Sequence, residues 1–343
     1  MKILCITDPK THPEFDTTVE LYNELANDRR FELFHTSLAS AQESEAFHCR
    51  PIRSAIPYDE FLRLDEYLPV EMRWNDFSLA FDRADHPLPD LFHERLALHE
   101  SKTVFINSPE GLRRTKQKAF AFEIARDVLK DAVFTRNALE IRNFLKLFPE
   151  VVAKMNTSYG GKGVFRIFRK GDQFEVDNVS TGTLLLKSLD EVIEWLLARD
   201  RDPFQLCRYL KNVTAGDKRI LVVGSEIYGG YLRKSPSGSW IQNVTSGGQA
   251  FPATVTEGER LIIERTAPAF QELGVFTLGY DFLLDDDGET WLLSEINAGN
   301  IGGYGRLQLT SGLPVYGRLL EWLLERAQMG SVKQPQLTMS RKQ

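Results

Sequence analysis

A glycine-rich loop between two strand-like runs is the first part of the sequence that suggests chemistry. In "VVAKMNTSYGGKGVFRIF", residues 151–168, the loop holds Gly160 and Gly161, and Lys154 lies on the run that enters it. Glycines are retained where the backbone must turn through positive φ or approach another group closely. A simple hairpin turn is one explanation of this loop. The other is a flap over nucleotide phosphates, in which Lys154 would neutralise phosphate charge and backbone N–H groups would bond the phosphate oxygens.

Two carboxylates placed around a tight turn form a second constellation. In "GYDFLLDDDGETWLLSEINAGN", Asp281 and Glu295 lie seven residues on either side of Gly288. If the strands pair symmetrically about the turn, the carboxylates face each other and Asn297 shares their face. Like charges placed opposite each other repel, so the pair indicates a cation, and these oxygen ligands suit Mg²⁺ or Mn²⁺. A one-residue bulge would break this pairing, and three separate surface residues are the alternative.

Composition narrows the class of protein. The chain has 343 residues, of which 42% are hydrophobic and 26% charged, and this length predicts two or three domains. We expect a cytoplasmic protein, because no apolar run is long enough for a membrane span and the start lacks a secretory signal. The net charge of −6 argues against non-specific nucleic-acid binding and leaves small charged ligands open. Three widely spaced cysteines indicate reduced thiols rather than disulfides.

The first 110 residues alternate predicted strands and helices, which indicates an α/β domain with a largely parallel sheet. We expect strands at 2–7, 30–38, 77–83 and 103–107, and helices at 16–28 and 89–101. Ligands of such sheets bind beyond the carboxyl ends of the strands, where Asp8 lies. Asp16 begins the following helix, whose free N–H groups would hold an anion, although simple capping explains Asp16 equally well.

The pattern changes after residue 111. Residues 112–129 predict one basic amphipathic helix, followed by a strand at 132–135 and a helix to about residue 148. Ser188 with Glu191 and Thr256 with Glu259 have capping-box spacing and begin two further helices. Strands are expected at 204–210, 217–234 and 239–245, and residues 331–343 lack periodicity and are expected to be a disordered tail.

The order of these segments resembles the ATP-grasp ligases, and within them the bacterial glutathione synthetase branch. "GGKGVFR", "AGDKRILVV", "YDFLL" and "INSPEGLRRTKQKAF" are similar to that branch, over residues 1–324 and most strongly over 118–297. The resemblance implies an α/β (α+β) fold with a Rossmann-like pre-ATP-grasp domain at 1–115. A two-subdomain ATP-grasp fold would follow, with the flap in 116–203 and the hinge strand and metal site in 204–330.

The resemblance also implies roles for individual residues. Arg219 and Arg233 would lie over the transferring phosphoryl group, and Asp281, Glu295 and Asn297 would bind the metal. Substrate contacts are expected from Asp8, Asp16, Arg83 and Arg306. The nucleotide would contact Lys118, Lys154, Gly160, Gly161, Gln205, Tyr209, Leu210 and Asn243.

The reaction implied by the resemblance has two steps. A carboxylate attacks ATP to give an acyl phosphate, and an amine then displaces phosphate to form an amide, so no protein nucleophile is needed. The partners would be small molecules rather than nucleic acid or membrane, and a homo-oligomer is left open.

The segment "AGNIGGYGRLQLTSG", residues 298–312, departs from the family pattern and leaves the substrates open. Gly302, Gly303 and Gly305 would form a carboxylate cradle beside Arg306, or a plain turn. The acid would be γ-glutamylcysteine or another peptide or amino acid, and the amine glycine or another amine. A nucleotide-binding regulator without turnover is the alternative from a different class.

Overall fold

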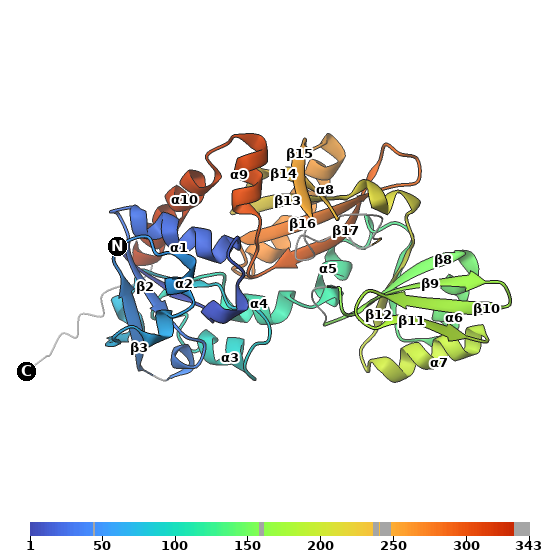
Figure 1. Cartoon of the computed structure of the whole chain (residues 1–343), viewed down its shortest axis with the longest axis horizontal. Coiled ribbons are helices and arrows are strands. Elements are labelled where there is room, and N and C mark those ends of the chain that lie inside the picture. Colours follow the sequence, from blue (N-terminus) through green and yellow to red (C-terminus); the bar gives the residue numbers. More distant parts are fainter. Residues whose placement is uncertain (44, 158–160, 236–239, 241–247, 333–343) are drawn as a thin grey trace, which may run out of the picture.

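Three β-sheets organise the chain (Figure 1). The computed structural model describes residues 1–43, 45–157, 161–235, 240 and 248–332. Gly160, Asn243 and most of the strand expected at 239–245 therefore lie outside the described residues, as does nearly all of the expected tail. The domain limits expected at residues 115 and 203 remain a prediction.

The first sheet has the order β4-β3-β2-β1-β5-β6, in which β2, β1, β5 and β6 are parallel. These parallel strands are the four that the sequence predicted. The antiparallel strands β3 and β4, which complete one side of this sheet, were not predicted. The strands are β1 (Lys2–Ile6), β2 (Glu32–Thr36), β3 (Ala46–Ile52), β4 (Val70–Arg73), β5 (Leu79–Asp82) and β6 (Val104–Ile106), with helices α1 (Thr17–Asn27), α2 (Tyr58–Phe61) and α3 (Phe92–Ala97) and short 3-10 turns η1 (Pro9–Thr11), η2 (Ser40–Gln42), η3 (Leu64–Glu66) and η4 (Trp74–Asp76).

The second sheet is antiparallel at every described pair and carries two helices. Its order is β11-β10-β9-β8-β12-β7, and α6 and α7 pack against it as one hydrophobic core drawn from residues 133–206. Its elements are β7 (Ala132–Thr135), α6 (Ala138–Leu147), β8 (Glu150–Met155), β9 (Val164–Lys170), β10 (Gln173–Asn178), β11 (Gly182–Leu186), α7 (Leu189–Arg199) and β12 (Phe204–Arg208). The glycine loop joins β8 to β9, so it connects two strands as predicted.

The third sheet, β15-β14-β13-β16-β17, lies between the second sheet and the first (Figure 1). One of its faces packs against α5 and α8. Thr256 and Glu259 cap α8 reciprocally, which confirms that capping box. The elements are η5 (Lys211–Ala215), β13 (Asp217–Val223), β14 (Glu226–Lys234), β15 (Gln249–Ala253), α8 (Glu257–Gln271), β16 (Thr277–Leu284), β17 (Trp291–Ala298), α9 (Tyr304–Ser311) and α10 (Val315–Val332).

The single helix expected over residues 112–129 is wrong. The structure has two short helices, α4 (Pro109–Thr115) and α5 (Lys118–Ile124). The helix breaks because Asn156, at the end of β8, captures the first turn of α5: its carbonyl accepts from Lys118 N at 3.3 Å and its side chain accepts from Ala119 N at 3.1 Å. This capture places Lys118 at the start of a helix and aims it at the third sheet.

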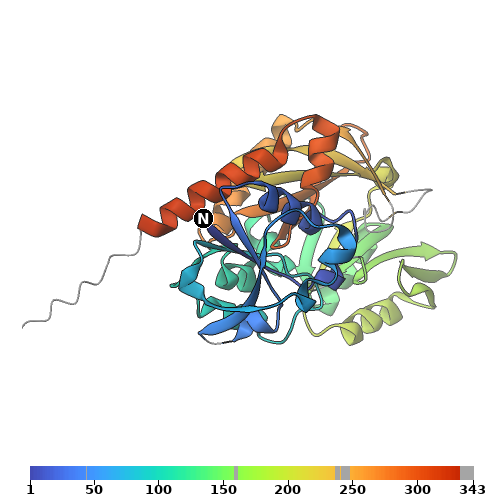
Figure 2. The same ribbon diagram turned by 60° about the vertical axis from the view of Figure 1, so that its left-hand side comes forward.

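The first and third sheets share one hydrophobic core. It combines residues of β1 and α1 with β13, β14, α9 and α10. Figures 1 and 2 both show α10 close to the N-terminus. Two glycines allow α9 to approach its neighbours: a Cβ on Gly303 would lie 2.0 Å from the Tyr231 hydroxyl, and one on Gly305 would lie 2.2 Å from the Glu20 carboxylate. The chain after β17 therefore packs closely against both β14 and α1.

We predict that Gly303→Ala destabilises the protein more than Gly312→Ala. Both residues have positive φ, at 102° and 72°, but Gly312 has open space where its Cβ would be. The left-handed backbone alone should cost about 1 to 2 kcal/mol at each site. The overlap with Tyr231 should add roughly 1 to 3 kcal/mol at Gly303 only. Urea unfolding of both variants measures the difference, and equal costs would contradict the close packing.

Candidate active site

The β16–β17 hairpin places Asp281 opposite Glu295, as the sequence predicted. A one-residue bulge, which we expected to break this pairing, is instead what produces it. Near the turn Phe282 pairs with Leu293, whereas Asp281 pairs with Glu295, so Ser294 is the extra residue. The Asn297 side chain shares their face, because its Nδ2 donates to Asp281 Oδ2 at 2.9 Å. The strand pairs nearest the turn are centred half a residue before Gly288, rather than on it. The extra residue Ser294 offsets this difference and brings Asp281 opposite Glu295.

A chain of four charged side chains runs across β13, β14 and β16. Arg219 donates to both Asp281 oxygens, and its Nη2 lies 2.8 Å from Oδ2. Arg233 donates to both Asp217 oxygens, at 2.6 and 2.5 Å, and its Nη2 also lies 2.8 Å from Asp281 Oδ1. The ladder explains these contacts, because Arg219 pairs with Asp281 and Asp217 with Arg233 on adjacent strands.

The two buried aspartates of this chain differ in pKa. Burial by itself raises the pKa of Asp281, but the guanidinium groups of Arg219 and Arg233 together lower it to about 2. Burial raises the pKa of Asp217 to about 6, and the Asp281 charge adds to the rise against the lowering by Arg233. The two pKa values differ because Asp281 contacts two guanidinium groups, whereas Asp217, among the described residues, contacts only that of Arg233.

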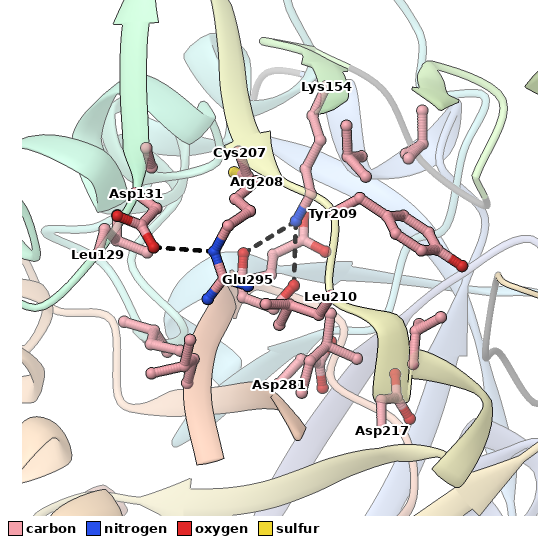
Figure 3. Close-up of a pocket in the computed structure, with 18 of the residues that line it drawn as sticks. Leu129, Asp131, Lys154, Cys207, Arg208, Tyr209, Leu210, Asp217, Asp281 and Glu295 are labelled. Atoms are coloured by element: carbon pink, nitrogen blue, oxygen red, sulfur yellow. Dashed lines mark hydrogen bonds and ion pairs between the residues drawn. The ribbon is translucent and has the colours of Figure 1, made fainter. Parts of the chain in front are cut away.

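Two lysines reach the same hairpin from outside the third sheet. Lys118 Nζ lies 2.9 Å from Glu295 Oε1, and Lys154 Nζ donates to the Ser294 carbonyl and hydroxyl oxygens at 3.0 Å each. Figure 3 shows Lys154 extending from its strand toward Glu295 and Asp281. Burial raises the pKa of Glu295, but the positive charges of Lys118 and Lys154 together lower it by more, so the pKa lies below its ordinary value.

These contacts correct one step of the sequence argument. We inferred a cation between the carboxylates because they would otherwise repel. Arginine and lysine side chains already balance both carboxylates, so repulsion alone does not require a metal. The donor set still fits one: two carboxylates and an amide oxygen suit Mg²⁺, which protein ligands hold together with substrate phosphates and water. Within the described residues, no cluster of three or more His, Cys, Asp or Glu side chains is placed to hold a metal unaided.

These groups line a cavity of about 380 Å³ between the second and third sheets. Tyr209 and Leu210, which follow β12, lie at its wall (Figure 3). Gln205 does not line it, but faces a void of about 20 Å³ beside Lys118 and Glu295. The predicted residues that line the cavity are Lys118, Lys154, Gly161, Tyr209, Leu210, Arg219, Arg233, Asp281, Glu295 and Asn297.

Sequence reasoning missed the apolar walls and the second aspartate. The missed lining residues include Leu129, Val152, Val164, Cys207, Val213, Asp217, Trp240, Leu283 and Leu292. Alternation along β8, β9 and β17 marks which side chains share a face, but it does not distinguish a cavity wall from a packed core. Asp217 had a usable signal, because it lies two residues before Arg219 on the same strand, β13, and therefore on the same face.

The four residues that we expected from the sequence to contact substrate do not line this cavity. Asp8 accepts from Lys10 N and Asp16 from Thr18 N, so both cap helical turns. Arg83 is 1% exposed and donates to Thr18 Oγ1 and, at 3.1 Å, to the Ile301 carbonyl. Arg306 lies on α9 beside Glu20, whose pKa burial raises above its ordinary value against the smaller lowering by Tyr316 and Arg306. All the described residues that line the cavity come from position 118 onward.

The backbone at Gly303, expected to form part of a carboxylate cradle, bonds a side chain of this protein instead. Gly303 N donates to Thr17 Oγ1 at 2.7 Å, so this N–H is occupied by the first residue of α1. Together with the Arg83 bond to Ile301, this contact joins the segment after β17 to the first sheet. In this arrangement the glycines serve close packing rather than anion binding.

We predict that Asp281→Asn lowers the free energy of unfolding by about 3 to 5 kcal/mol, because it leaves Arg219 and Arg233 without their shared carboxylate. Asp190→Asn is the matched control, since it removes an exposed ion pair with Arg142 and should cost less than about 1 kcal/mol. Chemical denaturation without added metal or nucleotide measures both. Equal costs would show that the charge chain does not stabilise the fold.

Comparison with known proteins agrees with this architecture. Residues 117–306 match the family described as "Prokaryotic glutathione synthetase, ATP-grasp domain". The chain is 27% identical over 334 residues to the glutathione synthetase of Neisseria meningitidis serogroup B, covering 92% of this chain and 95% of that protein. It is 29% identical to the glutathione synthetase of Mesorhizobium japonicum over 214 residues, or 61% of that protein.

Solved structures of two ligases share the fold. D-cycloserine synthetase DcsG aligns with a TM-score of 0.64 at 14% identity, over 95% of this chain and 99% of that one. D-alanyl-alanine synthetase A from Vibrio cholerae aligns with a TM-score of 0.58 at 11% identity, over 97% and 99%. The family match covers more than half of the chain. The protein therefore belongs to the prokaryotic glutathione synthetase family of ATP-grasp enzymes and is an ATP-dependent ligase that forms C–N bonds.

Proposed function

We propose that ATP and a carboxylate substrate react in the cavity between the second and third sheets. The observation that carries this proposal is the convergence of four cations on one carboxylate hairpin: Lys118, Lys154, Arg219 and Arg233 all contact β17 or Asp281. Such a surplus of basic groups in a partly apolar cavity suits a triphosphate with an attached ring. Tyr209 and Leu210 would meet the adenine and Gly161 the phosphates, and Gln205, Gly160 and Asn243 stay predictions.

The side chains have separate tasks in the proposed reaction. A substrate carboxylate attacks the γ-phosphorus and ADP leaves, which gives an acyl phosphate. An incoming amine then attacks the acyl carbon, inorganic phosphate leaves, and loss of a proton from the nitrogen gives the amide. Arg219 and Arg233 would move from Asp281 toward the phosphoryl oxygens, because phosphate offers the same bidentate geometry as a carboxylate. Lys118 and Lys154 would similarly exchange their contacts on β17 for phosphate. Asp217 would keep Arg233 in place during this exchange.

A divalent ion completes the proposed site. Bound there, Mg²⁺ or Mn²⁺ would neutralise phosphate charge and orient the triphosphate. Asp281, Glu295 and Asn297 would hold it, and release of the arginines by phosphate would free Asp281 to do so. The family acts with ATP and a divalent metal in general, and the choice of Mg²⁺ is our proposal.

The proposed substrates are γ-glutamylcysteine and glycine, or a related acid and amine. The likeness to glutathione synthetases over nearly the whole chain supports the first pair. The departure at residues 298–312 supports a related pair, because there the chain packs against α1. Arg83, Asp16 and Arg306 would contact substrate only if this packing opened. No described helix has the length and apolarity needed to cross a membrane, which is compatible with the small-molecule substrates and cytoplasmic location that we propose.

We predict that Lys154→Ala weakens ATP-analogue binding roughly ten- to a hundredfold, through the loss of a charge-assisted phosphate contact. Lys170→Ala is the control: Lys170 lies in the same sheet, is exposed, pairs with Glu175 and does not line the cavity. Calorimetry with a non-hydrolysable analogue measures both affinities, and thermal melting checks that both variants fold. Equal affinities of the two variants would overturn the assignment of the cavity.

The function is tested by phosphate release from ATP in the presence of amino acids and γ-glutamyl dipeptides. We expect release that requires both an acid and an amine, together with amide product. Glu295→Gln should lose nearly all turnover and gain less thermal stability than wild type from Mg²⁺ with an analogue. Without metal it should melt below wild type, because Lys118 loses its charged partner. Release independent of an amine would exclude the ligase reaction, and normal turnover in Glu295→Gln would exclude the metal site.

A further inference from the structure

The last residue of β10, Asn178, contacts the glycine loop with one end of its amide. Its Nδ2 lies 3.4 Å from the Gly161 carbonyl oxygen, 3.1 Å from that of Lys162 and 2.8 Å from that of Val164. We call residues 161–164 the returning arm, since they lead from the loop into β9. Asn178 is 2% exposed, so these contacts are shielded from water. One buried side chain therefore holds the whole described length of the returning arm.

The other end of the same amide organises a turn. Asn178 Oδ1 accepts from Ser180 N and Thr181 N at 2.9 Å each and from Thr181 Oγ1 at 3.2 Å. Carbonyl oxygens surround one end and N–H or O–H donors the other, so only one amide orientation satisfies both. Aspartate would satisfy the turn and repel the arm, and an apolar residue would satisfy neither. The two sides of the amide can thus be separated by mutation.

The returning arm is part of the cavity wall. Gly161 and Val164 line the cavity, and Val164 pairs with Lys154 in the ladder between β8 and β9. Asp177, the neighbour of Asn178, accepts from Trp240 Nε1 at 2.6 Å, and Trp240 lines the same cavity. The end of β10 lies beside β9 in the second sheet (Figure 1). This one strand end therefore contacts two walls of the cavity.

We propose that Asn178 is a positioning residue for ATP turnover, which sets the returning arm against the bound nucleotide without touching it. This inference rests on the proposed location of ATP in the cavity. A shift of the arm would move the Gly161 backbone and the partner strand of Lys154 together. ATP would bind less tightly, and the acyl phosphate would be less protected from water than in wild type.

The experiment compares Asn178→Asp with Thr181→Val. Asn178→Asp keeps the acceptor for the turn and replaces the donor by a carboxylate facing three carbonyl oxygens. Thr181→Val removes a contact on the opposite side of the same amide, at an exposed turn residue, and leaves the arm contacts intact. For each protein we would measure KM for ATP, kcat, the ratio of amide formed to ATP consumed, and trypsin cleavage after Lys162 with and without a non-hydrolysable analogue.

We expect Asn178→Asp to raise KM for ATP roughly tenfold or more, since several buried hydrogen bonds are lost. Amide formed per ATP should fall, and the analogue should protect Lys162 less. Thr181→Val should stay within about twofold of wild type, because exposed single contacts contribute little. A merely structural role would lower kcat through loss of active protein, and would leave KM and the amide-to-ATP ratio unchanged. That result would overturn the proposal.

Two further outcomes are decisive. Asn178→Ala removes the arm contacts without adding charge and should shift KM and the ratio in the same direction if Asn178→Asp fails to fold. Failure of both variants to fold would make Asn178 a structural residue and overturn the proposal. If wild type binds no ATP analogue, or if its affinity does not depend on Lys154, the location of the nucleotide is wrong. If wild type binds the analogue normally and the Asn178 variants keep the wild-type KM and amide-to-ATP ratio, the role of Asn178 is refuted while the location of the nucleotide stands.

Discussion

The register of β16 against its two neighbours is the constraint on which the site depends. Asp281 on β16 faces Arg219 on one side and Glu295 on the other. Side chains alternate between the faces of a strand, so a slip of one residue would turn a whole row away from the cavity. The extra residue at Ser294 sets this register on the β17 side and also presents the oxygens that Lys154 contacts. A local irregularity thus places a carboxylate and a lysine partner together.

The distribution of charge explains how such a polar group is kept inside the protein. Asp217 and Asp281 are buried with guanidinium partners, and Glu295 has an ammonium partner. Buried charges are tolerated only when they are paired and hydrogen-bonded. Each pairing joins a carboxylate to a basic group that also suits phosphate. The contacts that stabilise the protein by itself are therefore the ones that a triphosphate and a metal would replace, and this substitution costs less than ordering free side chains.

The hydrophobic cores divide the molecule differently from the active site. The first and third sheets share a core, whereas the second sheet has its own core within residues 133–206. Polar contacts join the second and third sheets, such as those of Arg208 with Asp285 and Asp286. Phe122 of α5 also packs against Phe134 of β7 in the second sheet. The glycine loop thus belongs to a separately packed unit that meets the carboxylate hairpin across a polar boundary.

The sequence alone determined the local elements and the chemistry of the central hairpin. The four strands that lie parallel in the first sheet and the capped helix α8 follow from alternation and capping residues, and spacing about Gly288 indicated that Asp281 and Glu295 lie on one hairpin. These are short-range properties, so the order of residues contains them. The motifs also led to the correct family. Lys154 was named from its place beside the glycine loop, and Lys118, Arg219 and Arg233 were named from that resemblance; the structure brings all four to one cavity.

Tertiary contacts decided what local pattern could not. Asn156 splits the predicted helix of residues 112–129 and so directs Lys118 toward Glu295. The turn of the hairpin lies half a residue from its expected centre, and the bulge at Ser294 compensates for the difference. Arg83 and Gly303 were expected to serve a substrate, but they join the first sheet to the segment after β17. The contacts of Asn156 with Lys118, of Arg83 with Ile301 and of Gly303 with Thr17 join residues that are distant in the sequence, so folding rather than sequence spacing decides their proximity.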